Sequence, residues 1–176
     1  MVAAAGHIAT RIRSFVMRAG RMTAGQEQGW QQGFPQFGLT VAQGALDWDK
    51  TFGSPGRRVL EIGFGMGDSL LQMAQAEPET QFVGIEVHQP GVGRLLSQAL
   101  GLGIGNLRVY AEDAVDVLSH CVAPASLDAV HIFFPDPWHK KRHHKRRLIQ
   151  PKFVGDLAHL MREDGYLHLA TDWTPY

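Results

Sequence analysis

The amino-acid sequence predicts an α/β domain whose mainly parallel sheet carries helices on both faces. Three observations favour this fold class. The chain has 176 residues, of which 44% are apolar, and this is enough to build one hydrophobic core. From Arg57 onward, short β-branched and aliphatic runs alternate with helical patterns, as they do in βαβ units. A glycine-rich turn joins the first of these runs to the first helical pattern.

The alternation assigns the elements in order. Strands are predicted over residues 58–62, 81–86, 107–111, 127–134 and 166–170. Helices are predicted from Asp68, over 90–100, over 114–119, and around Phe153, Leu157, Leu160 and Met161. Residues 135–147 are polar, basic and opened by two prolines, which predicts a loop after the fourth strand.

Residues 1–56 are predicted to form a separate N-terminal part before the domain at 57–176. A basic arm over 1–26 contains no acid, which is typical of a transit peptide, a solvated arm or a nucleic-acid contact. Residues 25–56 are rich in Gly, Gln, Trp and Phe without periodicity, which predicts an irregular extension beside the sheet. Arg11 and Arg13 interrupt any secretory signal, and no apolar run approaches the roughly 18 residues needed to span a bilayer.

Charge is distributed unevenly beneath a formal net charge of zero. Residues 57–134 hold 4 basic and 9 acidic side chains, whereas Lys140 to Arg147 hold six cations in eight residues. His139, His143 and His144 are interleaved there, but the adjacent cations oppose a metal ion and no acid or thiol completes a site. We therefore expect no metal. The one cysteine excludes an internal disulfide and fits a reducing, cytoplasmic compartment.

The strongest local motif is Glu61-Ile-Gly63-Phe-Gly65-Met-Gly67, between the first strand and the first helix. A P-loop is excluded because no Lys follows Gly67, and Asp68 stands where a dinucleotide fingerprint requires Gly or Ala. The remaining pattern is typical of S-adenosylmethionine sites in Rossmann-like methyltransferases, where an acid can accept the cofactor's ammonium group. The alternative is a glycine turn that serves packing only.

Two further acids follow predicted strands and should lie on the same rim of the sheet. Glu86 comes 23 residues after Gly63, close to the about 20 expected for the acid that accepts ribose hydroxyls. Asp113 follows the third strand and could accept from an adenine amino group. The alternatives are an exposed acid at a strand end and an N-cap for the next helix.

A carboxylate between two prolines follows the fourth strand, in the sequence Phe133-Phe-Pro-Asp136-Pro-Trp138. Such a segment is stiff, and it is related to the motif with which amine-methylating nucleic-acid enzymes orient and stack a base. The alternative is a rigid loop in which Trp138 is a packing residue.

Taken together, these motifs resemble the bacterial tRNA (guanine-N7-)-methyltransferase family. The resemblance rests on LEIGFGMG (60–67), GIEVHQPGVG (84–93), NLRV..EDA (106–114), FFPDPWHKKRHHKRR (133–147) and ATDW (170–173), with RIRSFVMRAGRMTAGQ (11–26) similar to the family's N-terminal arm. It covers the chain from about Arg11 to Tyr176 and disfavours a cleaved transit peptide. It implies a Rossmann-like class I methyltransferase fold that lacks the two C-terminal strands and the Thr-x-Phe-Glu-type motif with which family members continue.

The resemblance also implies roles for individual residues. It places S-adenosylmethionine against the glycine turn and against Glu61, Glu86, Asp113 and Asp136, with Asp136 as the catalytic residue. Contacts with tRNA are implied for Lys140, Arg142, His143, His144, Lys145, Arg146, Arg147 and Asp172. The charge pattern supports this role for the basic run at 140–147, because clustered cations on a ligand-binding rim suit a phosphate track.

The expected function is therefore methyl transfer from S-adenosylmethionine to N7 of a guanine in tRNA, in the variable loop according to the resemblance. Two rivals stay open at this point: a methyltransferase acting on another base or amine, and an RNA-binding module without catalysis.

Overall fold

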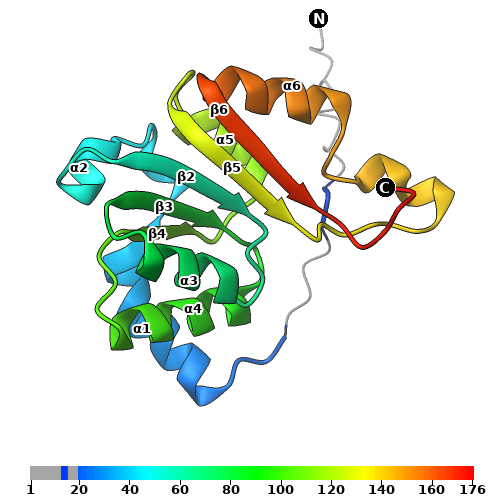
Figure 1. The fold of residues 1–176 in the computed structure, drawn as a ribbon. Coiled ribbons are helices and arrows are strands. Elements are labelled where there is room, and N and C mark those ends of the chain that lie inside the picture. Colours follow the sequence, from blue (N-terminus) through cyan, green and yellow to red (C-terminus); the bar gives the residue numbers. More distant parts are fainter. Residues whose placement is uncertain (1–12, 16–19) are drawn as a thin grey trace, which may run out of the picture.

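The computed structural model describes residues 13–15 and 20–176 and confirms the predicted α/β class (Figure 1). Six strands of the described part form one sheet in the order β1-β4-β3-β2-β5-β6, and every pairing is parallel. The strands are β1 (Gly38–Leu39), β2 (Arg57–Ile62), β3 (Thr80–Ile85), β4 (Leu107–Tyr110), β5 (Leu127–Phe133) and β6 (Met161–Ala170).

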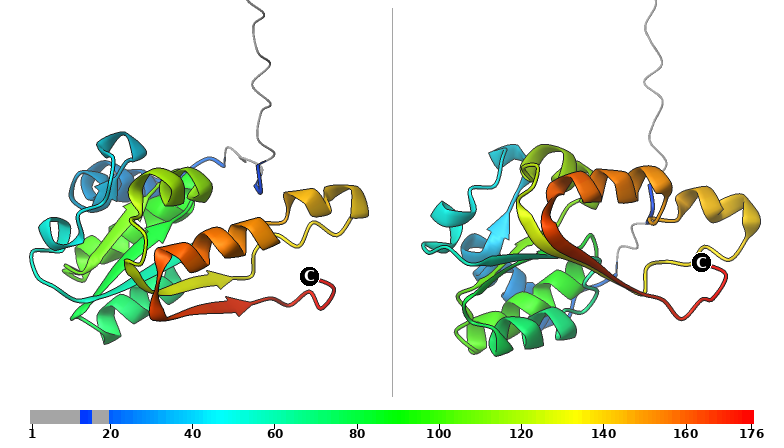
Figure 2. Two further views of the ribbon diagram at one scale, coloured as in Figure 1. Left: turned by 90° about the horizontal axis from the view of Figure 1, so that it is seen from above. Right: turned by 45° about the horizontal axis from the view of Figure 1, so that its top comes forward.

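Helices cover both faces of this sheet (Figures 1 and 2). They are α1 (Ala24–Phe37), α2 (Trp48–Phe52), α3 (Asp68–Ala76), α4 (Gln89–Gly101), α5 (Ala114–Cys121) and α6 (Pro151–Leu160), with the 3₁₀ helices η1 (Val41–Gln43) and η2 (Lys141–Arg146). Side chains of α3 and α4 form one hydrophobic cluster with the sheet, and those of α5 and α6 form the other. The sheet is thus buried from two sides, as a parallel sheet requires.

The prediction of an irregular extension over 25–56 is wrong for most of this segment, because the segment forms α1, β1, η1 and α2. Helix α1 packs on α4 through two glycines, and its aromatic side chains Trp30, Phe34 and Phe37 join the same hydrophobic cluster as α4. A Cβ added to Gly29 would stand 2.7 Å from the Ser97 Cβ, and one added to Gly33 would stand 2.7 Å from the Leu96 Cβ. This close approach of two backbones needs residues without side chains, and the low helix propensity of glycine weakens the helical signal of this segment.

Two other boundaries differ from the predictions. Met161 was expected on the last helix, but α6 ends at Leu160 and Met161 begins β6, which starts five residues before the predicted strand at Tyr166. The register shift between Leu127 and Ala129 lets the longer strand stay paired with β5. The sheet has six strands instead of five because β1 pairs with β4, and the predicted loop over 135–147 contains η2.

The strand order creates a switch point beside β2. From β2 the chain proceeds outward to β3 and β4, then returns to form β5 on the other side of β2. At such a point the connections after β2 and β5 diverge, which opens a crevice at the carboxyl ends of the strands. The glycine turn follows β2 and the segment with Asp136 follows β5, so the topology brings these two motifs together.

Candidate functional site

A pocket of about 220 Å³ lies at the carboxyl edge of β2, β3 and β5. Its floor is apolar, with side chains from the three strand ends, and its polar groups come from the connections that follow them. The lining residues used below are Gly63, Glu86, Glu112, Phe134 and Asp136, together with Ser14 and Phe15 of the N-terminal segment. The volume and the mixed lining suit a small ligand that is partly polar.

The glycine turn has the geometry that its sequence predicts. Gly63, Gly65 and Gly67 have φ values of +76°, +58° and +84°, which favour glycine. A Cβ built on Gly63 or Gly65 meets nothing within 4 Å, so these two positions border open space. At Gly67, the N-cap of α3, a Cβ would stand 2.8 Å from the Leu95 Cβ. The third glycine therefore serves packing, whereas the first two leave room for a ligand.

Glu86 follows β3 and binds the backbone around the pocket. Its Oε2 accepts a hydrogen bond from the Gly65 N–H at 2.8 Å, and its Oε1 accepts from the N–H groups of Val87 at 2.7 Å and His88 at 2.8 Å. The carboxylate thus joins the glycine turn to the start of α4. Two carboxylate oxygens offer about four acceptor positions, so capacity remains for a ligand hydroxyl.

Glu61 lies in β2 and is almost completely buried, with 2% of its surface exposed. Its Oε2 has no hydrogen-bond partner among the described residues, and burial raises the pKa of this carboxyl to about 7. Its register partners are Gly84 of β3 and His131 of β5. Glu61 does not line the pocket itself, although its neighbours Ile62 and Gly63 do. A cation close to this buried carboxyl would stabilise its ionised form.

The structure separates Asp113 from the pocket lining and places its neighbour Glu112 there. Asp113 is the N-cap of α5, where its Oδ1 accepts a hydrogen bond from the Val115 N–H at 3.0 Å. Glu112 accepts a hydrogen bond from the Val41 N–H through its Oε2 at 2.6 Å. The acid of this strand end that reaches the pocket is therefore one that the sequence motifs did not single out.

Asp136 is exposed and lies at the mouth of the pocket. The segment around it is held in an unusual conformation, because Phe134 and Trp138 have φ values of +51° and +45°. Such values are uncommon for residues with large side chains and tend to occur at functional sites. Trp138 is only partly exposed, and its indole N–H donates to the Ser14 carbonyl at 3.0 Å.

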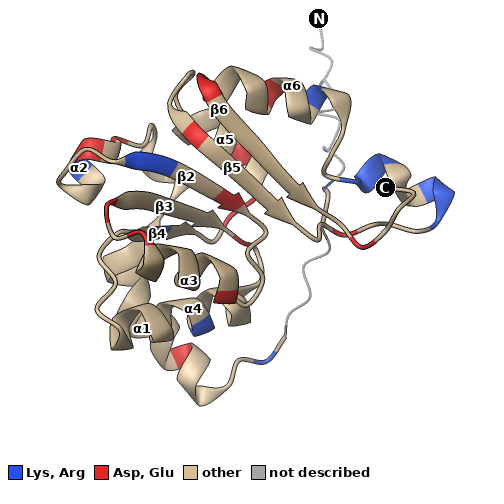
Figure 3. Ribbon diagram, viewed as in Figure 1, with Lys and Arg blue, Asp and Glu red and all other residues tan. Residues whose placement is uncertain are grey.

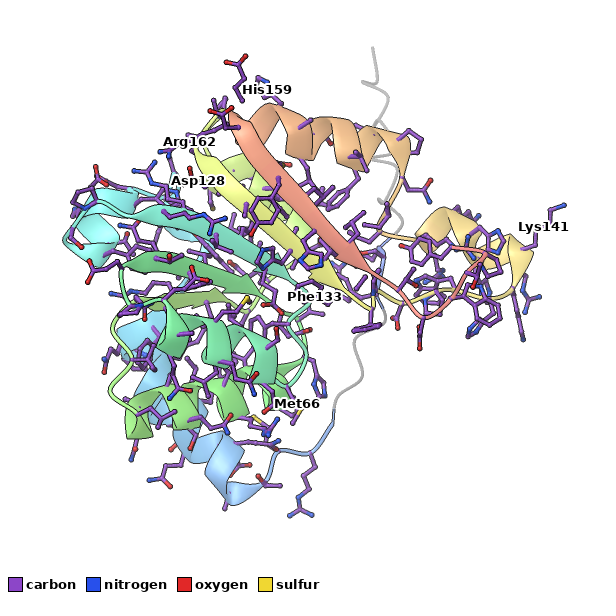
Figure 4. The ribbon with its side chains drawn as sticks, in the orientation of Figure 1. Met66, Asp128, Phe133, Lys141, His159 and Arg162 are labelled. Carbon is purple, nitrogen blue, oxygen red and sulfur yellow. The ribbon has the colours of Figure 1, made fainter. Side chains whose placement is uncertain are left out.

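The basic run forms η2, which follows Asp136 closely in the sequence and projects beyond the sheet (Figure 3). Two of its arginines fix it in place. The Arg146 guanidinium lies 5.2 Å from the centre of the Trp138 ring, and the Arg147 Nε donates to the Pro137 carbonyl at 2.8 Å. Lys141, at the outer end of the segment, points away from the sheet, whereas Phe133 lies at the sheet's carboxyl edge (Figure 4).

The remaining cations of the run face solvent. Lys140, Arg142 and Lys145 are exposed, and no acid separates them in the sequence. Desolvation and the surrounding cations, Arg142 first among them, lower the pKa of His143. The effect of the cations reflects a concentration of positive charge that a phosphate group would neutralise.

Asp172 lies in the tail after β6 and is exposed. The tail returns to the basic run: the Arg147 guanidinium lies 4.8 Å from the centre of the Tyr176 ring, and His139 packs edge-on against Trp173 with ring centres 4.2 Å apart. Figure 2 shows this return, with the C-terminus beside η2. Asp172 thus belongs to the same edge as the pocket without lining it.

Sequence reasoning missed the N-terminal contribution to the pocket. Ser14 and Phe15 line it, and the Trp138 hydrogen bond fastens this segment to the other side of the mouth. Arg11 and Arg18 of the predicted basic arm lie outside the described residues. A contact between residues separated by 124 positions leaves no local signal in a sequence.

No helix within residues 13–15 and 20–176 has the length and apolar character that a membrane crossing requires. The same residues contain no cluster of three or more His, Cys, Asp or Glu side chains placed to hold a metal ion.

Solved structures show the same fold. An antibiotic-related methyltransferase superposes with a TM-score of 0.54 at 15% identity, and the match covers 72% of this chain and 62% of that one. The 16S rRNA methyltransferase KamB gives a TM-score of 0.53 at 14% identity, covering 69% of this chain and 55% of that one. The fold and the glycine-turn pocket define a class I methyltransferase domain.

Sequence comparison identifies the family within this class. A family model described as "putative methyltransferase" matches residues 56–176. The tRNA (guanine-N(7)-)-methyltransferase of Pseudomonas paraeruginosa (strain DSM 24068 / PA7) is 56% identical over 165 residues, which are 94% of this chain and 68% of that protein. The protein of the same name from Stutzerimonas stutzeri (strain A1501) is 57% identical, over 94% of this chain and 69% of its own length. The chain belongs to the tRNA (guanine-N7-)-methyltransferase family.

Proposed function

We propose that this chain transfers the methyl group of S-adenosylmethionine to N7 of a guanine in tRNA, acting in the cytoplasm. One observation carries the proposal: a single edge of the sheet holds a pocket behind a glycine turn, an exposed carboxylate at its mouth, and a run of exposed cations beside it. The three features suit a small cofactor, a base and a phosphate backbone respectively. The names of the relatives, 56% and 57% identical, support the same reaction.

The residues present fit the cofactor. Gly63 and Gly65 border open space, Glu86 retains acceptor capacity for ribose hydroxyls, and the unpartnered Oε2 of Glu61 offers a counter-charge to an ammonium group. We propose that these residues hold S-adenosylmethionine. The sequence also predicts Asp113 for this role, but Asp113 caps α5 and its neighbour Glu112 lines the pocket, so we propose Glu112 as the acid of this strand end that faces the cofactor. When bound, this cofactor supplies a methyl group on a cationic sulfonium, which becomes a neutral thioether as the methyl leaves.

The base needs positioning more than proton transfer. Guanine N7 is a lone-pair acceptor without a proton, so the attacking atom requires no general base. The product gains a positive charge, and the exposed carboxylate of Asp136 can stabilise that charge as it develops. Because the N7 edge of guanine carries only acceptors, a carboxylate that binds the base directly must contact its opposite edge, where the N–H donors lie. Asp136 acts in one of these two ways.

The tRNA backbone is proposed to follow the basic run. Lys140, Arg142 and Lys145 are exposed and available to phosphates, while Arg146 and Arg147 hold the segment against Trp138 and Pro137. His143, His144 and Asp172 lie at the same edge and are proposed as further contacts.

The reaction is tested by transfer of labelled methyl groups to unmodified tRNA, followed by chemical cleavage at 7-methylguanosine. We expect incorporation with cleavage at one guanine of the variable loop. Incorporation without such cleavage would indicate another target atom, and tRNA binding without cofactor binding would indicate a non-catalytic RNA-binding module.

Two substitutions distinguish the roles open to Asp136. Asp136→Ala should lower kcat on the order of 100-fold, since it removes the group that faces the reacting base. Asp136→Asn keeps an acceptor oxygen but loses the charge, so it should retain activity only if Asp136 binds the base edge. Asp164→Asn changes an exposed carboxylate near the start of β6 and serves as the control. Wild-type kcat in Asp136→Ala would contradict the proposed role.

A further inference from the structure

Phe134 is an apolar residue with an exposed side chain and an unfavourable backbone conformation. It is the most exposed of the large hydrophobic side chains in the described part of the chain, with 65% of its surface accessible. Its φ of +51° is sterically unfavourable for a residue with a Cβ. The conformation is maintained by its neighbours, because the Phe134 N–H donates to the Ala170 carbonyl at 2.8 Å and Pro135 follows directly. The fold therefore holds a phenyl ring out of the core at this point.

The ring stands at the mouth of the pocket. Phe134 is a lining residue, as are Pro135 and Asp136. Phe134 immediately follows β5, which ends at Phe133, so its backbone is anchored by the sheet on one side and by a proline on the other. A ring fixed in this way loses little conformational freedom when a ligand packs against it.

Other aromatic side chains of this edge already contact neighbouring groups. The Arg13 guanidinium lies 5.8 Å from the centre of the Phe15 ring, and Phe133 packs against His168 with ring centres 5.0 Å apart. Trp138 donates its N–H to the Ser14 carbonyl, and the Arg146 guanidinium carbon lies 5.2 Å from the centre of its ring. The His143 ring packs against it in a T-shaped arrangement with ring centres 5.8 Å apart. Trp173 packs against His139 and does not line the pocket. Phe134 is the aromatic ring next to Asp136 whose surface stays open. The sequence motif had directed attention to Trp138 instead.

We propose that Phe134 is the stacking surface for the target guanine, and this proposal rests on the function proposed above. A base that enters the mouth of this pocket leaves its stack in the RNA, and an aromatic ring that takes over the lost stacking stabilises the extruded base. The phenyl ring would contact the π face of the base while Asp136, two positions further along, acts on its edge or charge. Phe134 thus binds substrate and Asp136 serves the reaction.

The experiment compares four substitutions of Phe134 in single-turnover methylation of unmodified tRNA at fixed salt. Phe134→Ala should lower kcat/KM for tRNA about 10- to 100-fold, the loss expected for one base–aromatic stack of about 1–3 kcal/mol. Phe134→Tyr and Phe134→Trp should retain activity within a few-fold, because they keep a ring. Phe134→Leu keeps apolar bulk without a ring and should resemble Phe134→Ala.

Two measurements separate this role from a structural one. Cofactor affinity, measured by calorimetry without RNA, should stay within about twofold of wild type in Phe134→Ala. Binding to tRNA with an abasic site at the target position should also be unchanged by Phe134→Ala, whereas binding to intact tRNA should weaken. Leu102→Ala, which alters another exposed apolar side chain just after α4, is the matched control.

The possible results distinguish failure of the proposal for Phe134 from failure of the proposed function. Equal activity of Phe134→Leu and Phe134→Tyr, or a parallel loss of cofactor affinity, would overturn the proposal and assign Phe134 to the pocket wall. Wild-type activity in Phe134→Ala would also overturn it while leaving N7 methylation intact. Absence of N7 methylation by the wild-type chain would instead refute the proposed function.

Discussion

Replacement of Glu61 by Gln should remove a pH-dependent loss of stability. Burial raises the pKa of Glu61 to about 7, against an ordinary value of 4.5 that the unfolded chain would show. Between these values the unfolded chain releases its proton while the folded chain retains it, so folding becomes less favourable as pH rises. The contribution of this carboxyl to the unfolding free energy is fully present below pH 4.5 and is lost by the time the pH has risen through 7. Each tenfold difference in proton affinity corresponds to about 1.4 kcal/mol, so the total is about 3 kcal/mol.

The assay is urea unfolding of the cofactor-free protein and of Glu61→Gln at pH 5 and pH 8. The amide is neutral at both pH values and similar in shape, so the variant lacks this titration. Relative to the wild type, Glu61→Gln should gain about 2.5 kcal/mol in unfolding free energy between pH 5 and pH 8, slightly less than the total because the unfolded chain is already partly ionised at pH 5. Both chains contain the buried His131 beside position 61, so its own titration largely cancels in the difference. A stability difference that does not change with pH would refute the reasoning.

Three further results are expected. S-adenosylmethionine should bind more tightly as pH rises through 7, because its ammonium group requires the ionised form of Glu61. Calorimetric titration at pH 6 and pH 8 should show this increase in affinity, and Glu61→Gln should abolish the increase. Gly67→Ala should unfold at a lower urea concentration than Gly63→Ala, since both positions have positive φ but only a Cβ at position 67 would collide with Leu95. Equal losses of unfolding free energy in the two variants would contradict this. Lys145→Ala should reduce the salt dependence of tRNA binding by about one in the log–log slope, whereas an unchanged slope would place Lys145 away from phosphate.

The sheet domain was predictable because its signals are local. Central strands such as β3 and β5 contain buried apolar runs, and helices such as α3 show a clear apolar face at Leu70, Leu71 and Ala74. The N-terminal elements were not predictable on this basis. The fit of α1 to α4 depends on Gly29 and Gly33, and glycine carries no helical periodicity and has a low helix propensity.

The residues of the candidate site were likewise predictable only where their signal is local. Gly63 and Gly65 could be found because a turn with positive φ favours a particular residue type, and Glu86 because it follows a strand at the expected distance. Glu112 reaches the pocket in place of its neighbour Asp113, and two adjacent acids cannot be distinguished before the strand end is placed.

The sequence alone determined the fold class, the glycine turn, the Pro-Asp-Pro segment and the concentration of cations after it, because each is a property of neighbouring residues. The tertiary structure decided which side chains share the pocket. It brought Ser14 to Trp138, left the Oε2 of Glu61 buried without a hydrogen-bond partner in the described residues, and turned the Phe134 ring outward. These outcomes depend on contacts between distant segments and on backbone angles, and residue identity specifies them only once the whole sheet has formed.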